Sequence, residues 1–127
     1  GCLGRPWLFA DLAEAARGSS RRVRPDLGFV LDVIRRHAAA LADHRGSEEH
    51  GVAEMRSHMA WYLKGYQVGG EVRRAAHLVT TLAGLDALLG QLDPAIPYPG
   101  PAAEGPRGRA GSEKRPILPE GWLNSRA

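Results

Sequence analysis

The stretch DLGFVLDVIRRHAAALADHRG, residues 26–46, decides the fold class. Apolar side chains recur in it every three or four residues, which is the spacing of one face of an α-helix. Asp26 stands where an N-cap residue is favoured, and Gly46 stands where a helix commonly ends. The stretch therefore predicts an amphipathic helix. Its apolar face carries Leu27, Val30, Leu31, Ile34, Ala38 and Leu41.

Three more helical patterns follow this stretch. Ser47 opens the first of them, which runs to Gly65 and places apolar residues on one side. The second covers 71–79, and the third covers 82–92 after the Thr80-Thr81 pair, which resembles a helix N-cap. Short connections between such helices favour an antiparallel arrangement.

A short helix is also expected before the deciding stretch. Pro6 suits a first helical turn, apolar residues continue at helical spacing to Ala15, and Gly18-Ser19-Ser20 ends the pattern. Alternating β-branched residues, the sign of a strand, are nearly absent. We therefore predict an all-α fold, a small antiparallel helical bundle.

Proline divides the chain near Asp93. Seven of the nine prolines follow this residue, together with five glycines between 100 and 121. Such a composition disfavours both helices and sheet interiors. We expect 94–127 to form an extended or disordered tail, although the apolar stretch 116–123 could dock locally.

Length and composition exclude several protein classes. The chain has 127 residues and a formal net charge of +3, which allows one modest domain. Its apolar runs are too short to cross a bilayer, and a single cysteine cannot form an internal disulfide. Because the chain begins with Gly1 and no signal peptide opens it, we expect a removed start or the end piece of a longer protein.

The cations are mostly arginine, 15 of the 17 Lys+Arg residues. Arginine suits phosphate contact, but codon bias in a GC-rich genome explains the preference equally well. Three patches are candidates for nucleic-acid contact: the loop 17–24, the set around Arg56, His58, Trp61 and Lys64, and the Arg73-Arg74 pair. The alternative is ordinary surface arginine, with Trp61 completing the core.

Metal binding and nucleophilic catalysis have less support in the sequence than nucleic-acid contact does. No two histidines have the spacing of a helical zinc site, and Glu54 with His58 supplies half of one at most. We interpret this pair as a surface contact and expect no metal. Cys2 has no recognisable partner base, so no catalytic constellation can be assembled. The glycines and the cation of 1–6 precede a helix and could suit an anion.

Several motifs together resemble the C-terminal third of bacterial tRNA-dihydrouridine synthases. They are GRPWLF at 4–9, MRSHMAWYLKG at 55–65 and EVRR at 71–74. The tail segments GPRGR at 105–109 and LPEGWL at 118–123 resemble actinobacterial members. The resemblance covers nearly the whole chain.

This resemblance implies an FMN-dependent enzyme that uses NADPH to reduce uridines in tRNA to 5,6-dihydrouridine. Members join a flavin-holding TIM barrel to a helical bundle that grips tRNA. By this resemblance, 1–25 is the end of the barrel with a short remnant of its last βα turn. Residues 26–93 form the tRNA-binding domain, and 94–127 form the tail. The catalytic cysteine belongs to the missing barrel, so this piece alone is predicted to be inactive.

The resemblance also implies site residues and partners. Gly1 and Cys2 are expected at the edge of the FMN phosphate loop. The expected tRNA-binding residues are Arg56, Lys64, Arg73 and Arg74. One alternative is that Arg56 or His58 braces the bundle against the barrel. The implied partners are tRNA and the N-terminal barrel, in the cytoplasm, with neither a membrane nor a metal.

Two further points stay open at this level. Gly84 occupies the position where a capping-box Glu would follow the Thr81 cap, which weakens that helix start. The competing functional class is a free-standing helical interaction or regulatory domain without catalysis.

Overall fold

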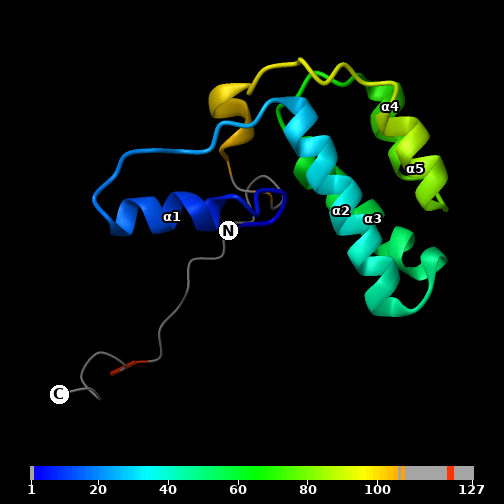
Figure 1. Ribbon diagram of the computed structural model, residues 1–127, viewed down its shortest axis with the longest axis horizontal. Helices are drawn as coiled ribbons and strands as arrows, with labels where there is room; N and C mark the ends of the chain where they lie inside the picture. Colours follow the sequence, from blue (N-terminus) through cyan, green and yellow to red (C-terminus); the bar gives the residue numbers. More distant parts are fainter. Residues whose placement is uncertain (1, 106, 108–119, 122–127) are drawn as a thin grey trace.

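The computed structural model describes residues 2–105, 107 and 120–121. Its elements are α1 (Leu8–Ala16), α2 (Leu27–Arg45), α3 (Glu48–Tyr62), α4 (Gly70–Ala76), α5 (Leu82–Leu89) and a short 3₁₀ helix, η1 (Gly100–Ala103). No strand occurs among these described residues, so the predicted all-α bundle is confirmed. Figure 1 shows α2 and α3 side by side, with α4 and α5 beside them and α1 set apart.

The boundaries of α2 and α3 follow the capping signals in the sequence. Asp26 Oδ1 accepts a hydrogen bond of 2.9 Å from the Phe29 amide, and Ser47 Oγ accepts one of 3.3 Å from the His50 amide. Gly46 ends α2 with φ of +61°, a backbone conformation in which glycine carries no steric penalty. Local residues therefore determine where the two helices of the antiparallel α2–α3 hairpin begin and where α2 ends.

The start of α5 uses a carboxylate from another helix. Thr81 Oγ1 accepts a hydrogen bond of 2.9 Å from the Gly84 amide, which confirms the expected N-cap. Gly84 has no side chain with which to complete a capping box. Glu48 Oε1, from the first turn of α3, instead accepts a hydrogen bond of 2.7 Å from the Leu82 amide. A distant acid therefore satisfies one of the donors left open at this helix end.

A close approach of backbones joins α2 to α3. A Cβ placed on Gly51 would lie 2.4 Å from both Cα and N of Ala42. Only a residue without a side chain fits there. Arg45 and Glu54 form an ion pair at the same end of the hairpin, with 2.7 Å between Nη2 and Oε2.

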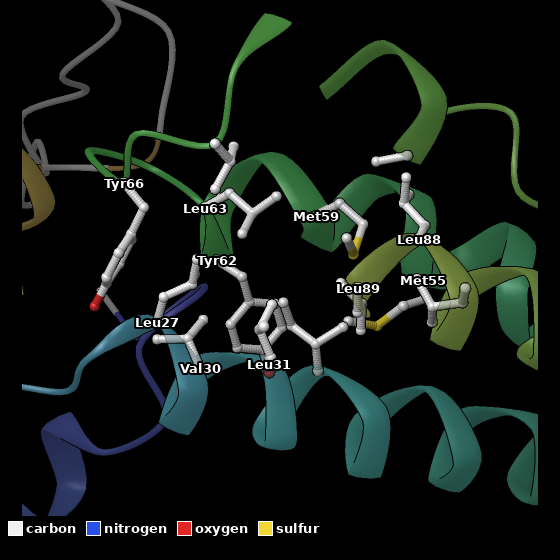
Figure 2. Packing of buried hydrophobic residues seen from close by; sticks show 14 of the residues in the cluster. Leu27, Val30, Leu31, Met55, Met59, Tyr62, Leu63, Tyr66, Leu88 and Leu89 are labelled. Carbon is white, nitrogen blue, oxygen red and sulfur yellow. The ribbon is translucent and has the colours of Figure 1, made fainter. Parts of the chain in front are cut away.

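The core lies between α2, α3 and α5. Side chains from all three helices meet in its centre, as Figure 2 shows. Arg35 of α2 also donates a hydrogen bond of 2.6 Å to Asp86 of α5 across the exposed edge. The core residues least exposed to solvent and largest in volume are Leu27, Ile34, Met55, Met59, Leu63, Leu85, Leu89, Val30 and Val52.

The Pro-rich segment after Asp93 differs from its expected description as a tail. Its carbonyls cap α2, since the Leu27 amide donates to Ile96 O at 2.8 Å and the Gly28 amide donates to Pro94 O at 2.9 Å. Ile96 packs against the core, and Ala103 in η1 is only 3% exposed. Proline lacks an amide hydrogen but keeps its carbonyl, so an extended Pro-rich segment can still serve a helix N-terminus. Residues 94–105 therefore contact the bundle, while the predicted division at 93/94 stays a prediction.

Parts of the predicted tail lie outside the described residues, including nearly all of the apolar stretch 116–123. Within the described part, no helix is both long and apolar enough to cross a bilayer.

Candidate nucleic-acid interface

The end of α3 and the turn after it carry most of the motif residues. Leu63 is the C-cap of α3, and Leu63 and Tyr66 are buried at 1% and 2% exposure. Between them, Lys64 and Gly65 are partly buried. The Tyr66 hydroxyl donates a buried hydrogen bond of 2.7 Å to the carbonyl of Pro25, and burial raises the pKa of Tyr66 to about 12. The turn is therefore anchored on both sides of Lys64.

Two arginines from other segments bind the carbonyls at this helix end. Arg73 Nη2, from α4, donates to Leu63 O at 3.0 Å and to Tyr66 O at 2.7 Å. Arg107 Nε donates to Trp61 O at 3.2 Å. Burial, followed by the nearby charge of Arg5, lowers the pKa of Arg107 to about 10. Two guanidinium groups thus face the negative end of the α3 dipole.

Arg73 makes its hydrogen bonds within the protein, and its predicted contact with tRNA stays a prediction. A partly buried guanidinium that bridges two backbone carbonyls is directed into the protein rather than towards a phosphate in solution. The sequence alone could not separate Arg73 from Arg74, because both lie in the same dipeptide. Arg107 lies in the GPRGR motif, from which the sequence predicts no structural contact.

The other expected cations keep accessible positions. Arg74 is exposed and Arg56 is partly buried, and among the described residues no hydrogen bond or ion pair of either side chain is found. Lys64 Nζ lies 3.0 Å from where a Cβ on Gly105 would stand, so its ammonium reaches over the segment after η1. Lys64 lies within the turn whose carbonyls Arg73 binds. No described contact joins Arg56 to Lys64 or to Arg73.

Two arginines of the basic loop 17–24 form ion pairs with glutamates outside the loop. Arg17 pairs with Glu14 at 2.8 Å, and Arg22 pairs with Glu104 at 3.1 Å. A hydrogen bond from Tyr98, together with the charge of Arg22, holds the pKa of Glu104 below its ordinary value. Two of the four cations in this loop are thus locally balanced, which makes it a weaker candidate than its sequence indicates.

A cluster of aromatic rings joins α2 to α3, and the sequence pattern does not predict that these residues lie together. The rings of His37 and His58 meet edge to face with centroids 4.7 Å apart, and His58 meets Trp61 in the same way at 5.1 Å. The Tyr62 hydroxyl is hydrogen-bonded to His37 Nδ1 at 2.9 Å. Trp61 is partly exposed and is absent from the main core cluster, so the alternative that it completes the core is not supported.

Burial lowers the pKa of His37, and the neighbouring His58 lowers it further, while Glu54 acts in the opposite direction. Glu54 itself binds Arg45, which keeps the pKa of this carboxyl below its ordinary value. Within the described part of the chain, no group of three or more His, Cys, Asp or Glu side chains could hold a metal ion. Glu54 and His58 therefore belong to an ion pair and a ring cluster.

The N-terminal turn packs on the end of α3. Gly4 has φ of +68°, and a Cβ there would lie 2.3 Å from the carbonyl of Trp61. Arg5 Nη1 donates a hydrogen bond of 2.9 Å to the carbonyl of Glu104. Cys2 is exposed, and Gly1 lies outside the described residues.

The expected anion site at the start of α1 is not formed by its amides. The amides of Leu8 and Phe9 already donate to the carbonyls of Arg5 and Pro6, and the Ala10 amide donates to Trp7. These donors are therefore unavailable to a phosphate group.

Helix α1 presents an apolar surface to solvent. None of its residues is buried, and Phe9 and Leu12 are each 64% exposed. Trp7, just before the helix, packs edge to face on Phe29 of α2 with centroids 5.8 Å apart. A helix of nine residues without a buried face is marginal on its own, so α1 is suited to packing against a further surface.

Comparison with known proteins gives a consistent match. The family model described as "Dihydrouridine synthase (Dus)" matches residues 1–95. A probable tRNA-dihydrouridine synthase of Mycobacterium tuberculosis is 51% identical over 123 residues, covering 97% of this chain and 31% of the relative. A probable tRNA-dihydrouridine synthase of Mycobacterium leprae is 50% identical over 123 residues, again 97% of this chain and 32% of the relative.

A more distant relative supports the same match. A probable tRNA-dihydrouridine synthase of Rickettsia typhi is 32% identical over 79 residues, covering 62% of this chain and 24% of the relative. No solved structure matches the chain. The chain spans about a third of the length of the mycobacterial relatives.

Proposed function

The chain belongs to the dihydrouridine synthase family, and we propose that it forms the tRNA-binding helical part of a tRNA-dihydrouridine synthase. The observation that supports this proposal is the anchored turn after α3, which contains the partly buried Lys64 near the end of a helix. The names of the relatives supply the RNA class, since they are described as acting on tRNA.

Contact with RNA would come from the accessible cations Arg56, Lys64 and Arg74. Phosphate contacts of this kind fix the orientation of an RNA without reading its sequence. Recognition of a folded RNA depends mainly on its shape and backbone. The whole enzyme would reduce a uridine to 5,6-dihydrouridine in the cytoplasm, where its tRNA substrates occur.

The reductive chemistry would come from FMN with NADPH as reductant. The start of α1 does not fit an FMN phosphate site, because the amides of Leu8, Phe9 and Ala10 donate to carbonyls within the chain. We derive no catalytic step from this chain. Its proposed contribution is to bind and orient the substrate RNA.

The rest of the enzyme is the proposed partner of α1. Phe9 and Leu12 would be covered by the flavin-binding barrel that the family resemblance implies. Covering two large apolar side chains contributes about 1.5–3 kcal/mol each. This accounts for an exposed helix next to a well-packed bundle.

Binding of tRNA to the 127-residue chain tests the proposal. We expect affinity in a mobility-shift assay to fall steeply as salt rises, because each phosphate contact releases counterions. The variants Arg56→Gln, Lys64→Gln and Arg74→Gln should each weaken binding and lower the salt dependence. Arg45→Gln is the matched control, since Arg45 lies at the opposite end of the hairpin and is paired with Glu54.

Absence of salt-dependent tRNA binding by the wild-type chain would contradict the proposal. The exposed apolar face of α1 favours one other function, a free-standing helical interaction domain. That alternative predicts self-association or capture of a protein partner that tRNA does not compete away. Binding of tRNA by the wild type and by Phe9→Ser with Leu12→Ser distinguishes the two, because the interaction-domain alternative predicts no tRNA binding by either protein.

A further inference from the structure

We propose that Arg73 is a positioning residue that holds the Leu63–Tyr66 turn and thereby fixes Lys64 for contact with an RNA phosphate. This inference rests on the proposed tRNA-binding function, but it gives Arg73 a role distinct from that of Arg74. The two residues are adjacent in sequence and carry the same charge, yet only Arg73 binds the backbone on both sides of Lys64.

The contacts of Arg73 enclose Lys64 within one short turn. The same Nη2 atom donates to the carbonyl before Lys64, at Leu63, and to the carbonyl two residues after it, at Tyr66. The Tyr66 amide also donates to Leu63 O at 3.1 Å, which closes the turn. Loss of the guanidinium would leave this turn with its internal hydrogen bond but without the group that bridges its two carbonyls.

Close packing on the other side leaves the turn little room to adjust. Gly65 has φ of +86°, and a Cβ there would lie 2.7 Å from the backbone of Ala102. Leu63 and Tyr66 are both buried beside it. The backbone of Lys64 is therefore held between the core, the segment near η1 and the Arg73 guanidinium.

Charge and reach identify Lys64 as the group that is positioned. Its ammonium extends over Gly105, and the residue as a whole is partly exposed. A phosphate contact from a long lysine side chain requires that its rotamers be restricted, which costs conformational entropy on binding. Because the backbone of Lys64 is already fixed, only this side-chain cost remains when the RNA binds.

A double-mutant cycle on tRNA affinity separates positioning from direct contact. Arg73→Gln should weaken binding about threefold to tenfold and reduce the salt slope by about one contact, as Lys64→Gln should. In the Lys64→Gln background, Arg73→Gln should have no further effect, because its role acts through Lys64. Arg74→Gln, the matched control, should weaken both backgrounds by the same factor.

The conservative variant Arg73→Lys sharpens this result. A lysine retains the charge, but its side chain is shorter than that of arginine and its ammonium should not reach the point from which Nη2 serves both carbonyls, so it should behave like Arg73→Gln. Retention of the wild-type salt slope by Arg73→Lys, or full additivity of the Arg73 and Lys64 effects, would overturn the proposal. Unchanged affinity of Arg73→Gln would overturn it as well.

A second readout does not need RNA. The chain has only two lysines, Lys64 and Lys114, so reductive ¹³C-methylation in a Lys114→Arg background labels Lys64 and the amino terminus while preserving their charge. Arg73→Gln should shift the Lys64 methyl signals towards those of an unstructured lysine, whereas Arg74→Gln should leave them unchanged. Identical spectra for Arg73→Gln and Arg74→Gln would refute the positioning role of Arg73 even if the wild type binds tRNA. Absence of tRNA binding by the wild type would refute the proposed function, whereas a shift of the Lys64 signals in Arg73→Gln alone would still show that Arg73 positions Lys64.

Discussion

The two ends of α3 are built in opposite ways. At its start, Ser47 caps the helix from the preceding position and Gly51 allows α2 to approach within the same hairpin. At its end, the carbonyls bind Arg73 and Arg107, which come from α4 and from the segment after η1. The first end depends on the hairpin that precedes it, and the second depends on segments that follow it, namely nearby α4 and the more distant Arg107.

This difference shows where structure and function separate in the domain. The locally encoded end closes the α2–α3 hairpin and carries none of the proposed RNA-binding residues. The end held by the segments that follow α3 carries Lys64 and the turn that Arg73 supports. Changes at the first end should therefore act mainly on stability, and changes at the second on both stability and binding.

Gly51→Ala should have the largest effect on stability. Helix propensity alone would favour alanine by about 1 kcal/mol. The new Cβ would meet the Ala42 backbone at 2.4 Å, and overpacking against a backbone should reverse the sign, with a net loss of about 2 kcal/mol. The free energy of unfolding in urea, measured by circular dichroism, checks this.

Gly46→Ala is the matched control for Gly51→Ala. No atom lies within 4 Å of a Cβ at Gly46, so its cost arises only from the positive φ, about 1 kcal/mol. Stabilisation by Gly51→Ala would mean that the two helices can separate without loss.

Tyr66→Phe should have the next largest effect, and it acts at the other end of α3. The change leaves the buried carbonyl of Pro25 without its donor, which should cost about 1.5 kcal/mol. Tyr98→Phe is the control, because the carboxylate of Glu104 that it contacts also pairs with Arg22. Equal losses in urea unfolding for the two variants would show that the buried position of Tyr66 does not matter.

Ser47→Ala should have a smaller effect, about 0.5–1 kcal/mol, because a single N-cap hydrogen bond is removed. Thermal unfolding followed at 222 nm provides the measurement. Affinity for tRNA should remain at the wild-type value, since the turn after α3 is unaffected. Weaker binding by a folded Ser47→Ala protein would break the proposed division between the two ends.

Mild acid should produce the smallest of these effects. The pKa of His37 is lowered in the folded state by burial and by His58, so the unfolded chain binds more protons as the pH falls. The contribution of His37 is therefore complete above its unfolded pKa of about 6.5 and is lost as the pH falls towards its folded pKa. Urea midpoints at pH 7.5 and 5.5 should differ more for the wild type than for His37→Gln. An equal difference in both proteins would exclude this origin.

Much of the bundle could be predicted because its signals are local. Asp26, Gly46, Ser47 and Thr81 mark helix ends through hydrogen bonds or φ values that involve only near neighbours. The face of α2 could be derived from spacing, since Leu27, Val30, Leu31, Ile34 and Ala38 are all buried. Local propensity and packing agree at these positions.

The rest depended on contacts between segments far apart in the sequence. Nothing local reveals that Glu48 serves the start of α5 or that Pro94 serves the start of α2. The candidate site shows the same limit, because the motif indicated Arg73 and Arg74 together and only the fold shows that their guanidinium groups differ in surroundings. The His37–His58 contact likewise required the register of the α2–α3 hairpin.

The capping of α2 by the Pro-rich segment has a consequence for the order of synthesis. The Leu27 amide finds its acceptor at Ile96, so the first turn of α2 stays incomplete while the ribosome is still producing the intervening helices. The hairpin can close around Gly51 early, but the start of α2 is finished only when Ile96 has emerged. A nascent chain arrested before that residue should therefore expose the start of α2 to proteases, and a chain released after it should not.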